Sequence, residues 1–402
     1  MAITYEQLSP DQVRAIEATV RWYNSRDPRP YTLFGAAGSG KTTVARFIVE
    51  ALGTTTQALA PTNRAAKILR NKGVDGARTI HSILFRPTQW CWTDNHVVDS
   101  RCVQDEAKHS HGVRFFKRED PPTGVKCFTI DEASMVGESI ASDVAMFGIK
   151  TLAIGDPYQL PPVMDKPGYG RDLPGVELDS MHRFDSLSDI GQLANMIRVS
   201  SGLSAWHRKL PYVGFDQRDN YDLILAWRNQ TRWQIVNTLR AIRGLPAETP
   251  VIGDRLISVA NTYEINILNA DELTVSGDPF PATNYGAINI PTKEAGLVQA
   301  WKKGFEDHEG EKWAAQQARR KGAAIAALTF SECMTVHKAQ GGEWPNVLVV
   351  DDLNAMAHTP GVDINTWAYT AVTRASQKID FIRIAEFPTG MKLRQLIAAA
   401  GV

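Results

Sequence analysis

One eight-residue stretch constrains the fold of this chain more than any other: Gly35 to Thr42 reads G-A-A-G-S-G-K-T. It lies between a short apolar run, Tyr31 to Phe34, and a segment whose apolar residues recur at helical spacing. A strand, a glycine-rich turn and a helix in this order form a phosphate-binding loop, whose backbone N–H groups and helix end surround phosphate oxygens. The sequence therefore predicts a nucleoside triphosphate site on an α/β sheet.

We expect the whole loop to contact the nucleotide. Lys41 is expected to reach the terminal phosphates, and the hydroxyl of Thr42 to ligate magnesium. The other expected nucleotide-binding positions are Gly35, Ala36, Ala37, Gly38, Ser39, Gly40 and Thr43. ATP and Mg²⁺ are the cofactors that this pattern predicts.

Short apolar runs alternate with helical patterns along the chain, and each run ends in polar residues. The runs are Tyr31 to Phe34, Thr56 to Ala60, Lys126 to Ile130, Thr151 to Ile154, Leu223 to Trp227 and Asn346 to Val350. This rhythm predicts parallel sheets flanked by helices, with functional groups at the carboxyl ends of the strands. Two irregular stretches, Phe85 to Gly124 and Asp271 to Gly322, interrupt the rhythm and indicate small insertions built mainly from strands.

Composition limits the class of protein. The 402 residues are 43% hydrophobic, and 44 Lys and Arg balance 44 Asp and Glu, so a nucleic-acid partner would have to be held by a local groove. There is no run of about 18 apolar residues for a membrane span, and Met1 to Pro10 lacks the pattern of a signal peptide. We expect a cytoplasmic protein without a membrane partner, in the host cytoplasm if the chain comes from a phage.

The cysteines raise a question about metal. Four potential zinc ligands, Cys91, Cys102, His109 and His111, fall within about twenty residues. Their spacings match no common zinc module, which favours ordinary thiols and surface histidines in an inserted subdomain.

Two further strand ends carry groups that a phosphate loop needs. The run Cys127 to Ile130 ends in Asp131 and Glu132, where Asp131 is expected to hold magnesium and Glu132 to act as the base that polarises the attacking water. The run Thr151 to Ile154 is followed by G-D-P-Y-Q-L-P-P, where Gln159 can contact the terminal phosphate or its water.

Together, G-A-A-G-S-G-K-T, D-E-A-S and G-D-P-Y-Q-L-P-P resemble the motifs of the superfamily-one helicases, in the branch of RecD-like and phage Dda-like enzymes. The resemblance implies two RecA-like parallel-sheet domains in tandem. Gln12, in the segment L-S-P-D-Q, resembles the glutamine that reads the adenine edge, and a helix capped at Ser9 explains the same residues.

Two segments of the first half resemble motifs that grip single-stranded DNA. These are A-P-T-N-R-A-A, with Thr62 and Asn63, and T-I-H-S-I-L, with Thr79, His81 and Ser82. Hydroxyl, amide and imidazole groups suit contacts to phosphate and sugar that read no sequence. Each segment alone is equally compatible with an inert loop.

The second half carries two more resemblances. The segment T-V-H-K-A-Q-G-G-E implies DNA contacts from Thr335, His337 and Lys338 and a ribose contact from Glu343. The segment Y-T-A-V-T-R-A implies that Arg374 reaches the phosphates as an arginine finger. Arg183, in L-D-S-M-H-R, is a second finger candidate on a shorter pattern, which a surface ion pair also explains.

The resemblance implies a domain order. A first motor domain spans residues 1–184 with a pin subdomain inserted at about 85–125, and a second comprises 185–270 and 323–402 around a small SH3-like β subdomain at 271–322. Phe115 and Phe116, between basic residues, are the pin candidates, because aromatic rings stack on bases. Anchoring a small core is the other interpretation of both rings, and extra residues at 90–111 leave the pin's position open.

The function implied is an ATP-dependent DNA helicase that moves 5′ to 3′ on single-stranded DNA and separates duplex at junctions. The resemblance implies a setting in DNA replication, repair or recombination, replication or recombination proteins as partners, and action as a monomer. A translocase or nucleoprotein remodeller with weak unwinding is the main alternative. A small-molecule kinase is the other, but it leaves the motifs around Thr335 and Arg374 unexplained.

Overall fold

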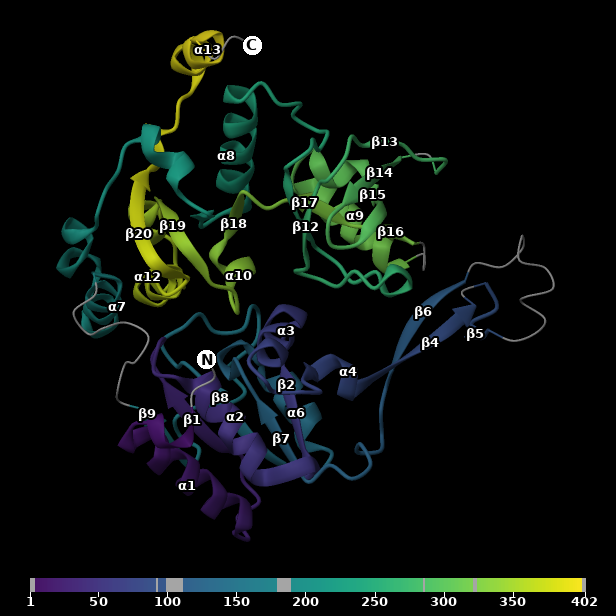
Figure 1. The fold of residues 1–402 in the computed structure, drawn as a ribbon, viewed down its shortest axis with the longest axis vertical. Helices are drawn as coiled ribbons and strands as arrows, with labels where there is room; N and C mark the ends of the chain where they lie inside the picture. Colours follow the sequence, from purple (N-terminus) through teal and green to yellow (C-terminus); the bar gives the residue numbers. More distant parts are fainter. Residues whose placement is uncertain are drawn as a thin grey trace.

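The computed structural model describes residues 4–91, 93–98, 111–178, 189–284, 286–320 and 324–399. Two α/β halves stack one above the other in Figure 1, each with a smaller unit extending to the same side. No helix in these described ranges combines the length and the apolar character that a membrane span requires.

A six-stranded sheet forms the first half. Every neighbouring pair of strands is parallel, in the order β3-β2-β7-β8-β1-β9. The strands are β1 (Tyr31–Gly35), β2 (Thr56–Ala60), β3 (Arg78–Thr79), β7 (Cys127–Ile130), β8 (Lys150–Gly155) and β9 (Gly175–Leu178). The helices of this half are α1 (Pro10–Asn24), α2 (Lys41–Leu52), α3 (Asn63–Asn71), α4 (Ile80–Leu84) and α6 (Glu138–Ala145).

Burial explains why these strands are continuous apolar runs. The four residues of β7 are all buried, as are the last five of β8, because one face packs against α1 and α2 and the other against the elements around α6. The sheet therefore presents the carboxyl ends of β1, β7 and β8 side by side at one edge.

The second half contains a four-stranded parallel sheet in the order β18-β10-β19-β20. Its strands are β10 (Leu223–Ala226), β18 (Cys333–Thr335), β19 (Trp344–Asp351) and β20 (Ala375–Arg383). The helices of this half are α7 (Asp189–Val199), α8 (Asn229–Ile242), α10 (Val336–Ala339), α11 (Leu353–Ala357), α12 (Ile364–Val372) and α13 (Gly390–Ala399).

A three-stranded antiparallel sheet projects from the first half (Figure 1). It consists of β4 (Phe85–Cys91), β5 (His96–Val97) and β6 (His111–Lys117), in the order β5-β4-β6. The long pairing of β4 with β6 runs from Phe85 opposite Lys117 to Cys91 opposite His111.

The smaller unit of the second half contains two sheets and a helix. One antiparallel sheet joins β11 (Arg255–Ser258) to β12 (Glu272–Thr274) and β17 (Leu328–Phe330). The other has the order β13 (Phe280–Pro281), β14 (Ala287–Thr292), β15 (Gly296–Trp301) and β16 (Ile325–Ala326). Helix α9 (His308–Arg320) packs against it.

The predicted α/β class with two parallel sheets is confirmed, and each predicted apolar run forms a strand of one of these sheets. The domain boundaries at 184/185, 270/271 and 322/323 stay predictions. Strands β11 and β17 lie outside the range 271–322 expected for the inserted unit, yet they form a separate three-stranded sheet with β12, in the order β12-β11-β17.

Candidate nucleotide and nucleic-acid sites

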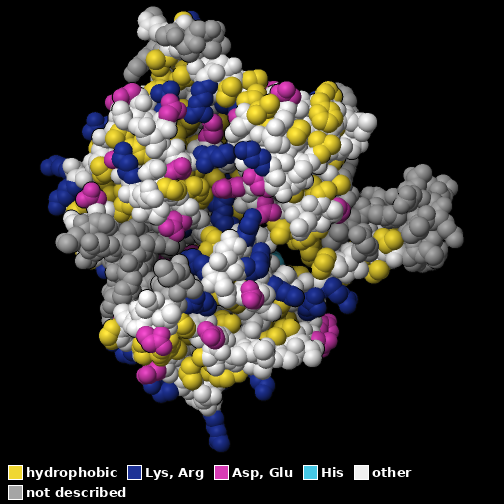
Figure 2. Space-filling view, viewed as in Figure 1, with side chains coloured by type: hydrophobic (Ala, Val, Ile, Leu, Met, Phe, Trp, Pro, Cys, Tyr) yellow, Lys and Arg dark blue, Asp and Glu magenta, His cyan; other side chains and the backbone are white. Residues whose placement is uncertain are grey.

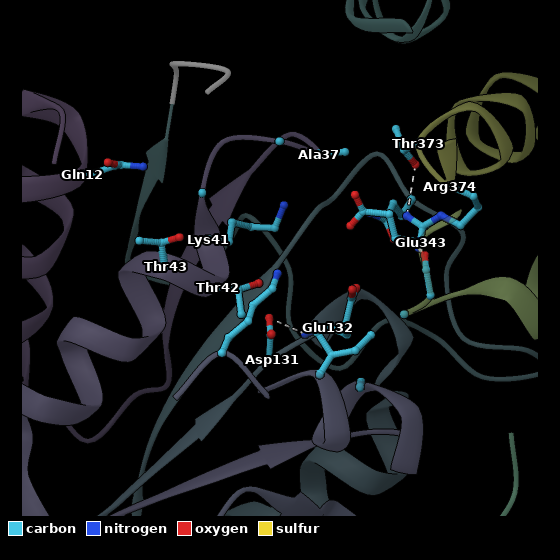
Figure 3. Close-up of a pocket in the computed structure, with 18 of the residues that line it drawn as sticks. Gln12, Ala37, Lys41, Thr42, Thr43, Asp131, Glu132, Glu343, Thr373 and Arg374 are labelled. Carbon is cyan, nitrogen blue, oxygen red and sulfur yellow. Dashed lines mark hydrogen bonds between the residues drawn. The ribbon is translucent and has the colours of Figure 1, made fainter. Parts of the chain in front are cut away.

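The phosphate loop opens into a cavity of about 360 Å³ between the two halves (Figure 3). The first half lines it with Gln7, Gln12, Ala37, Gly38, Gly40, Lys41, Thr42, Thr43, Ala65, Ile68, Lys72, Asp131, Glu132 and Gln159. The second half contributes Gly341, Gly342, Glu343, Thr373 and Arg374. Lys41 and Arg374, which lie some 330 residues apart in the sequence, therefore line the same cavity.

The loop depends on glycine at two positions. Gly38 and Gly40 have φ angles of 85° and 83°, in the left-handed region that disfavours side chains. A Cβ atom on Gly40 would also lie 2.3 Å from Nε2 of Gln12. The turn and the packing of α1 both exclude a larger residue at position 40.

Lys41 lies over its own loop. Its Nζ donates hydrogen bonds to the carbonyl oxygens of Gly35, at 2.8 Å, and Ala36, at 3.0 Å. Two neutral carbonyl acceptors thus hold the ammonium group at the mouth of the loop. A charged phosphate oxygen is a stronger acceptor and can take their place.

Asp131 and Glu132 stand at the end of β7, facing Lys41 and Thr42 (Figure 3). Burial, together with the charge of Glu132, raises the pKa of Asp131 to about 6. The N–H of Glu132 donates to Oδ1 of Asp131 at 2.9 Å, and Glu132 itself has a φ of 53°. This backbone conformation is rare outside glycine and turns two consecutive carboxylates toward the same cavity.

The loop after β8 supplies Gln159. Its Nε2 lies 3.5 Å from Oδ2 of Asp156, and its buried Oε1 has no hydrogen-bond partner among the described residues. An unpaired buried acceptor at the wall of this cavity is suited to a donor such as a water molecule.

A tyrosine that the sequence did not single out joins the two halves at the loop. The N–H of Ala37 donates to the hydroxyl of Tyr369 at 2.9 Å, and that hydroxyl donates to Oδ2 of the fully buried Asp156 at 2.7 Å. Burial and the negative charge of Asp156 raise the pKa of Tyr369, so the phenol stays protonated. In the sequence, Tyr369 is only the first residue of the segment Y-T-A-V-T-R-A, to which no role was assigned at that position.

Arg374 lies on the opposite wall from Lys41, with Glu343 and Thr373 beside it (Figure 3). Its guanidinium is buried and donates to the carbonyl oxygens of Thr370, at 3.0 Å, and Gly342, at 3.1 Å, and to the Thr373 hydroxyl. These contacts hold the cation at the cavity wall. Arg183, the second candidate, falls in the range 179–188, outside the described residues.

Gln12 makes the capping contact that the sequence predicted. Its Oε1 accepts from the N–H of Ser9 at 3.1 Å, which is the capping contact of α1, and its Nε2 donates to the carbonyl of Ser39 at 3.2 Å. The carboxamide lines the cavity and ties α1 to the phosphate loop. Whether it reads adenine stays a prediction.

A second cavity, of about 900 Å³, also lies between the halves. Its wall includes Thr62 from the first half and Ser258, Asn269, Glu309, Glu311, Lys312, Trp313, Gln316, Arg319, His337, Lys338 and Gln340 from the second. Figure 2 shows Lys and Arg side chains gathered along the hollow between the halves, with Asp and Glu among them. The wall of this groove carries Lys312, Arg319 and Lys338 together with Glu309 and Glu311, so its charge is mixed with a small excess of basic groups.

The groove brings together only some of the predicted DNA contacts. Thr62, His337 and Lys338 line it, whereas Asn63 donates to Asn261 at 3.2 Å beside it. The hydroxyls of Thr62, Thr79 and Thr335 cap the helices that follow them. Ser82 bonds back to the Thr79 carbonyl, and His81 stacks on Phe85.

Lys338 is already paired with an acid. Its Nζ contacts Oε1 of Glu311 on α9, whose other oxygen accepts from the buried Arg232. Burial and the charge of Arg232 lower the pKa of Lys338. A phosphate entering the groove at this point would compete with Glu311 for the lysine.

Comparisons with known proteins agree with this geometry. The AAA domain family matches residues 7–208, which is half of the chain, and the UvrD-like helicase C-terminal domain matches residues 330–379. The chain belongs to the AAA domain family and, with its UvrD-like C-terminal match, to the RecD-like and Dda-like superfamily-one helicases. The resemblance that the motifs indicated is confirmed.

Two curated relatives carry names of this helicase family. The ATP-dependent RecD2 DNA helicase of Deinococcus radiodurans is 25% identical over 369 residues, which cover 87% of this chain and 46% of the relative. The ATP-dependent DNA helicase dda of Enterobacteria phage T4 is 35% identical over 111 residues, covering 26% of this chain and 25% of the relative. The matches span less than half the length of either relative.

The fold is also that of solved helicases of this group. The crystal structure of the Pif1 helicase from Bacteroides in complex with ADP-AlF3 and ssDNA is 17% identical and has a TM-score of 0.54. The similarity covers 100% of this chain and 98% of that one. It supports the arrangement of two RecA-like domains in tandem.

Within this helicase fold, the two pin candidates differ in their surroundings. Phe116 packs on Trp90 with ring centres 5.1 Å apart, and the guanidinium of Arg114 lies over both rings. Phe115 is 46% exposed and faces Tyr263 of the second half at 5.6 Å. The small-core interpretation therefore fits Phe116, while Phe115 remains available to a ligand.

The nucleotide site was predictable because each motif ends a strand of the sheet. Sequence reasoning missed Gln7, Lys72 and Tyr369, which lie at or beside the nucleotide cavity. Gln7 and Lys72 carried no motif signal. Of the four residues considered for zinc, Cys102 and His109 lie outside the described residues, and Cys91 is fully buried.

Proposed function

We propose that this chain is an ATP-dependent DNA helicase that moves 5′ to 3′ on single-stranded DNA as a monomer and separates duplex ahead of it. One observation carries the proposal: Lys41 and Arg374 line the same cavity from different halves, next to a groove that is also shared by both halves. A nucleotide bound there would touch both motor domains, so its hydrolysis would change how they sit on a strand.

The residues present fit a magnesium ion. Thr42 and Asp131 offer oxygen donors, which Mg²⁺ prefers. The raised pKa of Asp131 reflects a buried carboxylate without enough positive charge around it, which a dication would supply. When bound, the ion would neutralise charge on the phosphates.

The remaining groups divide the chemistry among themselves. Glu132 is the proposed base for the attacking water, and Gln159 positions that water with its unpaired oxygen. Arg374 meets the charge that develops on the phosphoryl oxygens, with Arg183 proposed as a second finger. Lys41 leaves its loop carbonyls for the terminal phosphates.

Stepping would follow from alternate grips on the strand. Thr62 on one side of the groove and His337 with Lys338 on the other belong to different halves, so closure brings the two grips together and hydrolysis lets them part. Thr79, His81 and Ser82 are proposed to extend the grip of the first half. Phosphate contacts of this type predict weak sequence preference.

The curated relatives support this proposal through their names, which describe ATP-dependent DNA helicases, and the solved Pif1 helicase through its bound ssDNA. The direction of movement, the DNA track and action at junctions are carried over from the family. Partners in replication or recombination are proposed on the same basis.

Two assays test the proposal. ATP hydrolysis is measured with and without single-stranded DNA, and strand separation is measured on partial duplexes that carry either a 5′ or a 3′ tail. We expect stimulation by DNA and separation only with the 5′ tail, and no turnover from Lys41→Ala. A flat ATPase response would support the kinase alternative. Stimulation without separation on either duplex would support a translocase.

A further inference from the structure

A cluster of metal-ligating side chains lies outside the motor, at the far end of the β4–β5–β6 sheet. Cys91, Asp94 and His96 each offer one donor atom, and these atoms all lie within 4.8 Å of one another. Cys91 is buried, whereas Asp94 and His96 keep 47% and 30% of their side chains accessible. An ion could therefore enter from the exposed side.

The spacing of the donors fits a tetrahedral site. Oδ2 of Asp94 lies 3.9 Å from Sγ of Cys91 and 3.8 Å from Nε2 of His96. Bond lengths of about 2.0–2.3 Å around a tetrahedral zinc ion separate neighbouring ligand atoms by roughly 3.3–3.8 Å. Small side-chain movements would bring the three donors onto one ion.

His96 already has the orientation of a metal ligand. Its Nδ1 lies 2.6 Å from the carbonyl oxygen of Val97. A carbonyl oxygen can only accept, so Nδ1 carries a proton, and in the neutral ring the lone pair is on Nε2, which lies 3.8 Å from Oδ2 of Asp94. Metal-bound histidines commonly donate their second ring nitrogen to a carbonyl in this way, which fixes the tautomer.

Backbone register explains why these residues meet. Cys91 pairs with His96 on β5 and with His111 on β6, so three adjacent strands bring residues of ligand type to one position in the sheet. Asn95, in the turn between β4 and β5, has a φ of 55°, and this tight turn places Asp94 beside both strands.

We propose that Cys91, Asp94 and His96 bind a divalent ion of the zinc class. A thiolate, a carboxylate and a neutral imidazole carry two negative charges in total, which one dication neutralises. Sulfur and nitrogen donors select zinc over magnesium or calcium. This ligand set differs from the four residues that the sequence brought to attention, and it rests on the described residues alone.

The site would stiffen the pin. Arg114 of β6 reaches Oδ1 of Asn95 at 3.5 Å and stacks on Trp90 and Phe116, so the ligand turn is tied to the strand that carries the pin candidates. A three-stranded sheet has little core of its own, and small domains often use a structural metal for that reason. The ion would hold the end of the sheet that β4 and β6 share.

The test uses the full chain with its purification tag removed, because a polyhistidine tag binds metal. Zinc is measured by elemental mass spectrometry after dialysis, and the zinc-free protein is titrated with Co²⁺, whose thiolate charge-transfer band reports a cysteine ligand. We expect about one zinc per chain and that band. No bound zinc together with a cobalt spectrum that lacks the band would overturn the proposal.

Variants assign the ligands. Cys91→Ala and His96→Ala should each lose the zinc and the charge-transfer band, while Cys127→Ala and His358→Ala, which lie far from the site, should keep both. Retention of zinc by Cys91→Ala would also overturn the proposal. Asp94→Asn keeps the shape of the side chain, so a loss of zinc in this variant cannot be attributed to unfolding. We expect the zinc affinity of this variant to fall on the order of tenfold or more.

Discussion

At the scale of single residues, the hydroxyl of Tyr369 connects the two halves at the nucleotide site. It accepts from the phosphate loop at Ala37 and donates to Asp156, which also contacts the amide of Gln159. One oxygen atom of the second half is thereby linked to the loop and to the proposed water-positioning group of the first. Tyr369 is a positioning residue by this geometry.

Tyr369→Phe tests that link. Removing the hydroxyl leaves the buried Asp156 with one donor fewer, and such a loss is worth about 1–3 kcal/mol. We expect the DNA-stimulated kcat to fall about tenfold or more, while the KM for ATP changes little because Lys41 is untouched. Tyr5→Phe, at an exposed ring, is the matched control. An unchanged kcat would mean that the hydroxyl only packs the domains together.

Asp131 predicts a dependence on pH. Its pKa is raised to about 6, so a proton must leave before the carboxylate binds an ion, and magnesium-dependent ADP affinity should fall about tenfold for each pH unit below about 6. Calorimetric titrations from pH 5 to 7.5 measure this. The same titrations with EDTA in place of Mg²⁺ are the control, because they lack the ion and should lack this component of the pH dependence.

The raised pKa of Asp131 affects the stability of the ligand-free protein in the opposite direction: low pH weakens ion binding but stabilises the fold. Because the folded pKa lies above the ordinary value of about 3.9, the proton binds more tightly to the folded state and stabilises it at low pH. That contribution is lost as the pH rises from about 4 through about 6. Asp131→Asn should remove this part of the pH dependence of thermal unfolding, and persistence of it would assign the effect to another group.

At the scale of elements, the central strands of both parallel sheets were predictable because they are buried on both faces, as β7, β8 and β10 are. The edge strands β3, β9, β18 and β20 were not among the predicted runs. The pairing of β11 with β12 and β17 was not predictable, because short amphipathic strands carry no signal for their partner. Tyr369 was missed for a related reason: its bond to Ala37 joins residues 332 positions apart.

Strand β6 carries both pin candidates, for which we expect different roles. Phe115→Ala should leave DNA-stimulated ATP hydrolysis within about twofold of wild type and cut strand separation severalfold, because an exposed ring can stack on bases. Phe116→Ala should instead lower the stability of the β4–β5–β6 sheet, since it removes a ring packed on Trp90. Strand separation on a 5′-tailed duplex and limited proteolysis measure the two effects. Equal loss of ATPase and separation in Phe115→Ala would contradict the assignment.

Helix α9 is fixed to the second motor domain through Glu311. Arg232 is fully buried and donates to this carboxylate as well as to the carbonyls of Phe330 and Cys333. Glu311→Ala would leave Arg232 without its counter-ion, which typically destabilises a protein by about 3–5 kcal/mol. Urea unfolding followed by tryptophan fluorescence measures the loss. Glu309→Ala, at an exposed position on the same helix, should change stability by less than about 0.5 kcal/mol.

At the scale of the whole molecule, the nucleotide cavity is closed by contacts within one chain. Besides Tyr369, the N–H of Leu160 donates to the Thr370 hydroxyl, and Arg64 forms an ion pair with Glu272 across the halves at 2.7 Å. These contacts make the two halves one unit around the cavity. The proposed arginine finger, Arg374, is then supplied in the same chain as the phosphate loop.

Mixing two inactive variants tests this arrangement. Lys41→Ala removes the phosphate contact of the first half, and Arg374→Ala removes the finger of the second, a loss on the order of 10³-fold or more in rate. If both groups must belong to one chain, an equal mixture of the variants should hydrolyse ATP no faster than the two separate samples combined, with single-stranded DNA present throughout. Nucleotide binding by Arg374→Ala and DNA binding by Lys41→Ala confirm that each is folded. Recovery of activity in the mixture would show that one copy completes the site of another, because only a chain with an intact loop can then use the arginine of its neighbour.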